Sequence, residues 1–130
     1  MSNKKVILIT GASSGIGYQT AEQLAKEGHI VYGAARRVDA MKPLEAFGVT
    51  PVRLDISDDS SIKEALNVII SKENRIDVLV NNAGYGSYGA VEDVTIDEAK
   101  MQFEVNIFGL ARLTQLVLPY MRKQKSGRII

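Results

Sequence analysis

A glycine-rich segment near the start of the sequence has the composition of a phosphate-binding turn. It reads Thr10-Gly11-Ala12-Ser13-Ser14-Gly15-Ile16-Gly17 and stands between the apolar run 6–9 and a stretch whose apolar residues recur at helical spacing. Glycines permit a sharp bend off the strand, close approach of backbone to a pyrophosphate and tight packing of the next helix. The helix N-terminus then presents unpaired N–H groups and the positive end of its dipole. We therefore predict a dinucleotide site that uses Gly11, Ser13, Ser14, Gly15, Ile16 and Gly17, with a glycine-rich turn that holds no ligand as the alternative.

The elements that must position this turn alternate between strand and helix along the whole chain. Short apolar runs predict strands over 6–9, 30–35, 51–54 and 76–80, with the opening of a fifth at 128–130. Helical spacing predicts helices between them: the first stops at Gly28, a weak short one lies around 41–47, and the last runs from about 96 towards 123. This order calls for an α/β fold, a doubly wound parallel sheet (Rossmann fold) with helices on both faces. We expect the strand order 3-2-1-4-5, with the ligand at the carboxyl ends of strands 1 and 4, where that order reverses.

Particular residues predict where these helices begin and end. Residues 57–61 offer several N-caps for one helix. Capping-box spacing, which satisfies the free N–H groups of a helix start, occurs at Ser61 with Glu64 and at Thr95 with Glu98. Pro119 should kink the last helix or end its regular part. Gly127 should terminate that helix, and a break is expected in it near 101–105.

Three motifs, in order and on the expected elements, resemble those of the classical short-chain dehydrogenase/reductase family. They are the glycine segment 10–17, the segment Asn81-Asn82-Ala83-Gly84 directly after the fourth strand, and Val105-Asn106 in the long helix. The resemblance implies that Asn82 ties the fourth strand to the glycine turn, while Ala83 and Gly84 bring backbone close to the adenosine ribose. It implies that Asp55 contacts the adenine, although an acid at a helix start explains that residue equally well. It also implies that Asn106 belongs to the catalytic set and disturbs the long helix, so that a backbone carbonyl can hold a water.

The end of the second predicted strand indicates the cofactor. An acid there holds the ribose hydroxyls of NAD, whereas an arginine accommodates the 2′-phosphate of NADP. By the resemblance, the acidic position falls on Ala35, and Arg36 and Arg37 follow it. A guanidinium can donate two parallel hydrogen bonds to a phosphate, so Arg36 and Arg37 favour NADP over NAD. The resemblance implies that Ser13 touches the same phosphate. Asp39 is a competing acid, but it lies past the strand end, where capping of the next helix is the better interpretation; a solvated loop is the alternative for the two arginines.

The residues that perform the family's chemistry do not occur in this sequence. The family's hydride transfer uses a serine, a tyrosine and a lysine, the last two spaced Tyr-x-x-x-Lys, and none of the five tyrosines has a lysine four residues later. We therefore expect the chain to be the N-terminal, cofactor-binding part of an NAD(P)-dependent oxidoreductase, acting between NADP(H) and an alcohol or carbonyl substrate and inactive by itself. A non-catalytic NADP(H)-binding module, or a site for an adenosine-bearing methyl donor, are the alternatives.

Composition excludes several other classes. The 130 residues suit a single domain over 1–130, and a net charge of +1 gives no broad field for nucleic acid or anionic lipid. With no cysteine and one histidine, His29, we expect no disulfide and no metal site. The N-terminal apolar run is too short for a signal peptide or a membrane span. We expect a cytoplasmic protein and, by the resemblance, a homo-oligomer at full length.

Overall fold

A five-stranded parallel sheet forms the centre of the computed structural model, which describes residues 3–130. The strands are β1 (Val6–Thr10), β2 (Ile30–Ala35), β3 (Thr50–Arg53), β4 (Val78–Val80) and β5 (Arg128–Ile129). Their order is β3-β2-β1-β4-β5, and every neighbouring pair is parallel. The predicted fold class and strand order are therefore confirmed.

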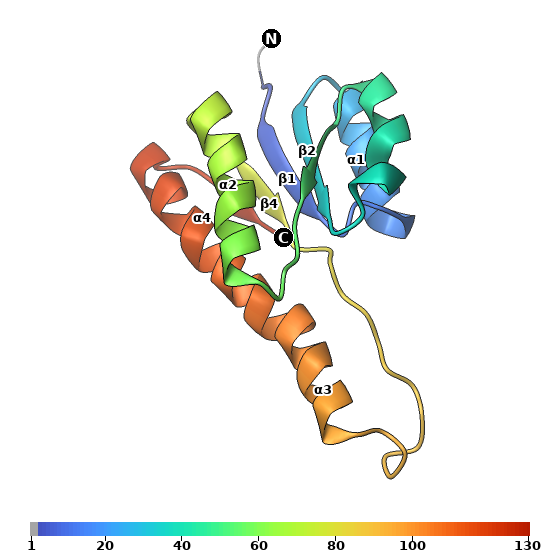
Figure 1. Ribbon diagram of the computed structural model, residues 1–130. Helices are drawn as coiled ribbons and strands as arrows, with labels where there is room; N and C mark the ends of the chain where they lie inside the picture. Colours follow the sequence, from blue (N-terminus) through green and yellow to red (C-terminus); the bar gives the residue numbers. More distant parts are fainter. Residues whose placement is uncertain (1–2) are drawn as a thin grey trace.

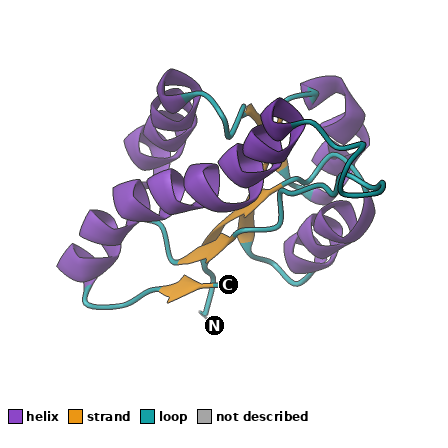
Figure 2. Cartoon of the chain, turned by 90° about the horizontal axis from the view of Figure 1, so that it is seen from below, coloured by secondary structure: helices purple, strands orange, loops and turns teal. Residues whose placement is uncertain are grey.

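Helices cover both faces of the sheet (Figure 1). They are α1 (Gly15–Lys26), the 3₁₀ segment η1 (Val38–Phe47), α2 (Asp59–Glu73), α3 (Ile96–Phe103), the π-helical segment η2 (Glu104–Gly109) and α4 (Leu110–Gln124). The α1 helix and η1 pack on one face, and α2 and α4 pack on the other. Figure 2 shows α3, η2 and α4 as one long helical run along the sheet.

The core explains why the first strand reads as a continuous apolar run. Every residue of β1 is buried. Side chains of a strand alternate between faces, so Leu8 joins the core under α2 and α4, while Ile7 and Ile9 join the core under α1 and η1. A strand that is covered on both sides needs apolar residues at every position.

Helix starts agree with the sequence at one position and differ at another. The Thr95 hydroxyl accepts a hydrogen bond from Glu98 N (3.1 Å), as predicted for the start of α3. At α2 the N-cap is Asp58, which lies within the predicted range 57–61 but is not the Ser61 of the predicted capping box; its carboxylate accepts from the N–H groups of Ser60 (3.0 Å) and Ser61. Ser61 instead lies inside the first turn, where its buried hydroxyl accepts from Asp55 N (2.8 Å). A carboxylate three residues earlier thus takes the capping role that the hydroxyl was expected to fill.

The long helix ends differently from the prediction. The α4 helix continues through Pro119 to Gln124, and the residue that stops it is Lys125, in the left-handed conformation (φ 56°). Gly127 follows the end rather than making it, and a Cβ there would overlap the Met121 side chain. The predicted stop of α1 at Gly28 (φ 96°) is confirmed by its N–H, which donates to Ala25 O.

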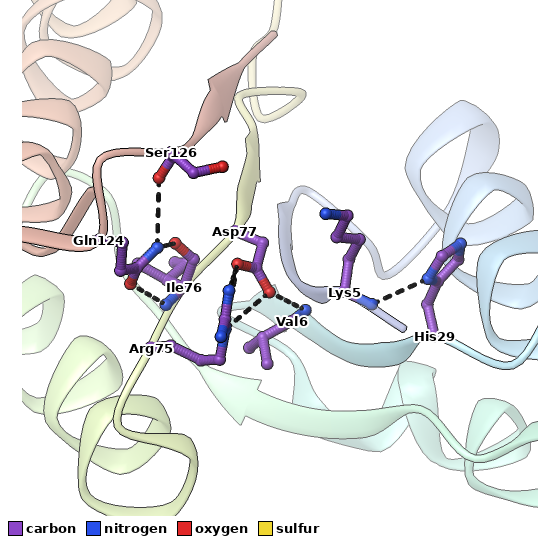
Figure 3. A network of polar contacts seen from close by, with 8 residues as sticks. All are labelled: Lys5, Val6, His29, Arg75, Ile76, Asp77, Gln124 and Ser126. Atoms are coloured by element: carbon purple, nitrogen blue, oxygen red, sulfur yellow. Dashed lines mark hydrogen bonds and ion pairs between the residues drawn. The ribbon is translucent and has the colours of Figure 1, made fainter. Parts of the chain in front are cut away.

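A polar network fixes the amino-terminal edge of the sheet (Figure 3). The buried carboxylate of Asp77 accepts from Val6 N (2.8 Å) and from the guanidinium of Arg75. Gln124 Oε1 accepts a hydrogen bond from Ile76 N (3.1 Å), and Gln124 Nε2 donates one to Ile76 O (3.0 Å). The backbone N–H and C=O of Ile76 are thus paired with a side chain, and β4 begins at Val78 rather than at residue 76 as predicted.

Candidate cofactor-binding site

A cleft of about 1030 Å³ opens at the carboxyl ends of β1, β2, β3 and β4. Four segments line it: the glycine turn, the residues that end β2, the connection from β3 to α2, and the segment that follows β4. Met101 of α3 and Val105 of η2 complete the wall. The cleft lies where the strand order reverses between β1 and β4, which is the place predicted for the ligand.

The glycine turn keeps its shape through two left-handed residues, Gly11 (φ 65°) and Gly15 (φ 58°). A Cβ at Gly11 would stand 2.8 Å from Ala83 Cα, and one at Gly17 would stand 2.5 Å from Gly11 O. The backbone therefore approaches its neighbours more closely than any other residue type allows. Ser14 is the N-cap of α1 but its side chain makes no capping hydrogen bond, which leaves the first N–H groups of that helix open to a ligand.

The predicted residues of this turn divide into two groups. Gly11, Ser13, Ser14 and Ile16 line the cleft, whereas Gly15 and Gly17 shape the turn behind it. The Ile16 side chain is 79% exposed although it is apolar. An exposed isoleucine at the mouth of the cleft offers an apolar surface to a ligand lying across the turn.

A buried hydroxyl, not foreseen from the sequence, joins the glycine turn to the segment after β4. Thr10 Oγ1 accepts from Asn82 N and from Ala83 N, both at 3.0 Å. The Asn82 side chain adds a third link, because its Nδ2 donates to Gly11 O (3.2 Å). Asn82 therefore ties the two loops together, while Ala83 and Gly84 present their backbone to the cleft. The signal for Thr10 was a hydroxyl side chain at the last position of an otherwise apolar strand.

The end of β2 places two cations on the cleft wall. Arg36 and Arg37 both line the cleft, and within residues 3–130 neither takes part in an ion pair. Ala35, the position of the missing acid, is buried under η1 and α1. Asp39 lies in the first turn of η1 and outside the cleft lining, so it does not replace the acid.

Asp55 lines the cleft as an ionised acceptor. Its Oδ1 accepts from Ser57 N (3.0 Å) and Ser57 Oγ (2.6 Å). These hydrogen bonds, aided by the charges of Arg36 and Arg53, outweigh its partial burial and hold the pKa of Asp55 below the ordinary value. Since Asp58 caps α2, Asp55 is not the acid that starts that helix, and its carboxylate stands at the cleft with capacity for a further donor.

Asn106 lies in the π-helical segment and not on the cleft wall. Its Oδ1 accepts from Tyr85 N (3.0 Å) and its Nδ2 donates to Tyr85 O (2.7 Å). A Cβ at Gly84 would stand 3.0 Å from the same Oδ1, so the loop passes tightly over the helix. The irregular turn spans 104–109 and overlaps only the end of the predicted break at 101–105. π-Helical turns commonly occur at functional sites.

Two further polar residues extend this contact along the same helical face. Gln102 Oε1 accepts from Ser87 N (2.7 Å), and the Glu98 carboxylate accepts from Ser87 Oγ. With Asn106 they stand at intervals of four residues, the spacing that puts side chains on one face of a helix. Sequence analysis missed this ladder, although the polar residues at four-residue spacing were its signal. The ladder holds the loop after β4 against α3, and both project beyond the sheet in Figure 1.

Comparison with known proteins identifies the family. The family model described as short chain dehydrogenase matches residues 5–130. The chain belongs to the short-chain dehydrogenase family. Within that family, it is 47% identical over 127 residues to a 3-ketodihydrosphingosine reductase of Bacteroides thetaiotaomicron, covering 97% of this chain and 45% of the relative.

Two solved short-chain dehydrogenase structures show the same fold with different cofactors. An alcohol dehydrogenase of Thermococcus sibiricus, complexed with 5-hydroxy-NADP, is 29% identical with a TM-score of 0.90, covering 98% of this chain and 57% of that one. A 3-ketoacyl-(acyl-carrier-protein) reductase of Brucella melitensis, complexed with NADH, is 32% identical with a TM-score of 0.89, covering 95% and 52%. The chain spans about half the length of the relatives it matches. A nicotinamide cofactor is therefore common to the neighbours, whereas its 2′-phosphate is not.

Neither a membrane-spanning helix nor a metal-binding cluster is present within residues 3–130. No helix there is both long and apolar enough to cross a bilayer. No group of three or more His, Cys, Asp or Glu side chains within that range could hold a metal ion.

Proposed function

We propose that residues 1–130 form the NADP(H)-binding Rossmann domain of an oxidoreductase that acts on an alcohol or carbonyl substrate. The observation that carries the proposal is the composition of the cleft wall. At one end stand an open helix N-terminus and the backbone of the glycine turn. At the end of β2 stand two arginines without ion-pair partners in the described chain, next to an alanine where NAD-binding folds have an acid.

The residues present fit a dinucleotide with a 2′-phosphate. The open N–H groups of α1 suit the pyrophosphate, because they add hydrogen-bond donors to the positive end of the helix dipole. Arg36 and Arg37 suit the 2′-phosphate, since a guanidinium binds phosphate with two parallel hydrogen bonds. Asp55 supplies an ionised acceptor for the amino group of an adenine. The bound cofactor would supply or accept the hydride.

The chain's own residues would then orient the cofactor and shape the substrate side. Thr10 and Asn82 hold the two cofactor loops at a fixed separation. Asn106 holds Tyr85 beside the cleft, and Tyr85 with Met101 gives that end of the wall a largely apolar surface. The expected catalytic role of Asn106, and assembly into a homo-oligomer in the cytoplasm at full length, stay predictions.

The test is a titration of residues 1–130 with NADPH and with NADH. Replacing the arginines (Arg36→Asp with Arg37→Ala) should raise the Kd for NADPH by about ten- to a hundredfold, the worth of a charge-assisted phosphate contact. The Kd for NADH should change much less. Equal losses for both nucleotides would show that these arginines do not read the 2′-phosphate.

A binding module without catalysis, and a site for an adenosine-bearing methyl donor, are distinguished by two further measurements. The methyl donor should fail to displace NADPH. The gene downstream of codon 130 should encode Tyr-x-x-x-Lys after the fifth strand. A stop codon there would favour the module.

A further inference from the structure

The edge of the sheet beside the cleft carries a third arginine. Arg53 is the last residue of β3, an edge strand, and its register partner on β2 is Ala35. Its neighbours Val52 and Leu54 point into the core under α2. Strand alternation therefore places Arg53 on the opposite face, the face to which Ala35 belongs. Since neighbouring strands lie about 4.8 Å apart, the Arg53 side chain starts directly beside the position where an acid would hold the ribose of NAD.

Arg53 has the charge environment of a ligand-binding residue. It is exposed, and among residues 3–130 it makes no ion pair within 4.0 Å. The nearby carboxylate is that of Asp55, which already accepts two hydrogen bonds from Ser57. Arg36 and Arg53 both lie near enough to Asp55 for their charges to lower its pKa. Arg36 and Arg53 thus lie near one carboxylate, and Arg37 lines the same cleft, which leaves a local surplus of positive charge.

We propose that Arg53 is a further specificity-determining residue of this site: a third cation that attracts the 2′-phosphate of NADP(H) and is free to do so because residue 35 is an alanine. The inference rests on the proposed function. An aspartate at position 35 would stand beside Arg53 and neutralise it. The single residue Ala35 thus has two effects, since it removes an acceptor for the NAD ribose and leaves the neighbouring strand's guanidinium unpaired.

The expected effect of Arg53 is smaller than that of Arg36 and Arg37, because Arg53 stands at the rim and outside the cleft lining. An exposed ion pair contributes up to about 1 kcal/mol, which is about fivefold in affinity. Arg53→Ala should therefore raise the Kd for NADPH by about three- to fivefold at low ionic strength, with the Kd for NADH changed less than about twofold. The difference should shrink as salt is added, because exposed charges are screened within about 10 Å at 0.1 M.

A double-mutant cycle tests the link to Ala35. In an Ala35→Asp background, Arg53→Ala should have almost no further effect on NADPH, because the new carboxylate already neutralises the guanidinium. Independent residues would instead give additive losses. Arg53→Lys should keep most of the preference for NADPH, since it retains the charge.

The experiment uses residues 1–130 and measures Kd for NADPH and NADH at two salt concentrations. The matched control is Arg122→Ala, which removes an exposed arginine at the far end of α4, outside the cleft lining. An unfolding curve for each variant confirms that the fold is kept. The inference is overturned if Arg53→Ala weakens both nucleotides equally, or neither, while the Arg36 and Arg37 changes still abolish the preference for NADPH. That result would leave the proposed function standing, whereas failure of the unchanged protein to bind NADPH would overturn both.

Discussion

The hydroxyl of Thr10 offers the sharpest test of how this fold builds its cofactor site. Thr10→Val keeps the shape of the side chain and removes only the oxygen. The residue is 2% exposed, and its Oγ1 accepts from two backbone N–H groups, those of Asn82 and Ala83, both at 3.0 Å. Within residues 3–130, Ala83 N has no other acceptor, whereas Asn82 N also donates to Val80 O at 3.1 Å.

The cost of the substitution follows from this geometry. A buried donor left without a partner costs about 1–3 kcal/mol. The penalty falls on Ala83 N, because Asn82 N keeps Val80 O as an acceptor, and Ala83 is only partly buried. Thr10→Val should therefore lower the free energy of unfolding by about 2 kcal/mol, against a total of about 5–15 kcal/mol for a domain. Thr10→Ser keeps the hydroxyl and loses one methyl group, a cost of about 1 kcal/mol.

Urea unfolding followed by circular dichroism measures both variants, and NADPH titration measures the site. The expected order of stability is the unchanged protein, then serine, then valine. NADPH affinity should fall in the valine variant, because the segment after β4 is no longer held to the glycine turn, and stay within about twofold for serine. Burial of apolar surface alone predicts the opposite order, with valine at least as stable as threonine. That opposite order would refute the reasoning.

Three further predictions follow from the same structure. Gly17→Ala should abolish NADPH binding and reduce stability, measured by titration and urea unfolding, because its Cβ would stand 2.5 Å from Gly11 O; equal binding by the alanine variant would contradict it. Burial alone would raise the pKa of Asp77, but hydrogen bonds from Arg75 and Val6 N and the nearby positive charges outweigh burial and lower this pKa. The ionised carboxylate therefore stabilises the fold at pH values above its unfolded pKa of about 3.9. That stabilisation is lost as the pH falls through the lower pKa of the folded state. Asp77→Asn should therefore cost about 1–2 kcal/mol at pH 7 and flatten the loss of stability below about pH 4; unfolding curves from pH 7 to pH 3 that run parallel in both proteins would count against it. Residues 1–130 should show no NADPH oxidation with a panel of ketones and aldehydes, since the Tyr-x-x-x-Lys pair is absent from the sequence; turnover above background would point to another proton donor.

The sequence predicted the sheet well because burial on both faces leaves a strong mark. The strand β1 is apolar at every position but the last, Thr10, so its type and its place in the order could be inferred from one short run. Helix ends were harder to predict, because several neighbouring residues can each cap or terminate a helix. Asp58 and Ser61 can both cap a helix, and Lys125 adopts the left-handed conformation two residues before the expected glycine. Such competition is decided by small differences in local hydrogen bonding, which a pattern does not record.

The residues of the candidate site also differ in how well the sequence predicts them. The glycine turn and the two arginines could be found because their composition is unusual for their position. Thr10 is marked only as a hydroxyl at the end of an apolar strand, and its role could not be inferred because its partners lie 72 and 73 residues further along the chain. Arg53 matters only through its register with Ala35, which requires the pairing of β2 and β3 to be known. Residues that act through a distant partner leave no local signature.

The two ends of the parallel strands differ in whether their backbone groups are paired. At the amino ends of the strands, the side chains of Asp77 and Gln124 already pair with backbone groups of Val6 and Ile76, so these groups are not available to a ligand. At the carboxyl edge, Thr10 satisfies two N–H groups, yet the first N–H groups of α1 lack a side-chain cap. Unpaired donors at a helix start cost stability unless water or a ligand pairs with them. A nucleotide that pairs with them should therefore stabilise the fold in proportion to its affinity, so NADPH should raise the urea midpoint more than NADH does. This difference should shrink in the Arg36 and Arg37 variant to the smaller share that Arg53 provides, since it arises from the 2′-phosphate. A difference that stays undiminished there would place the discrimination elsewhere in the cleft.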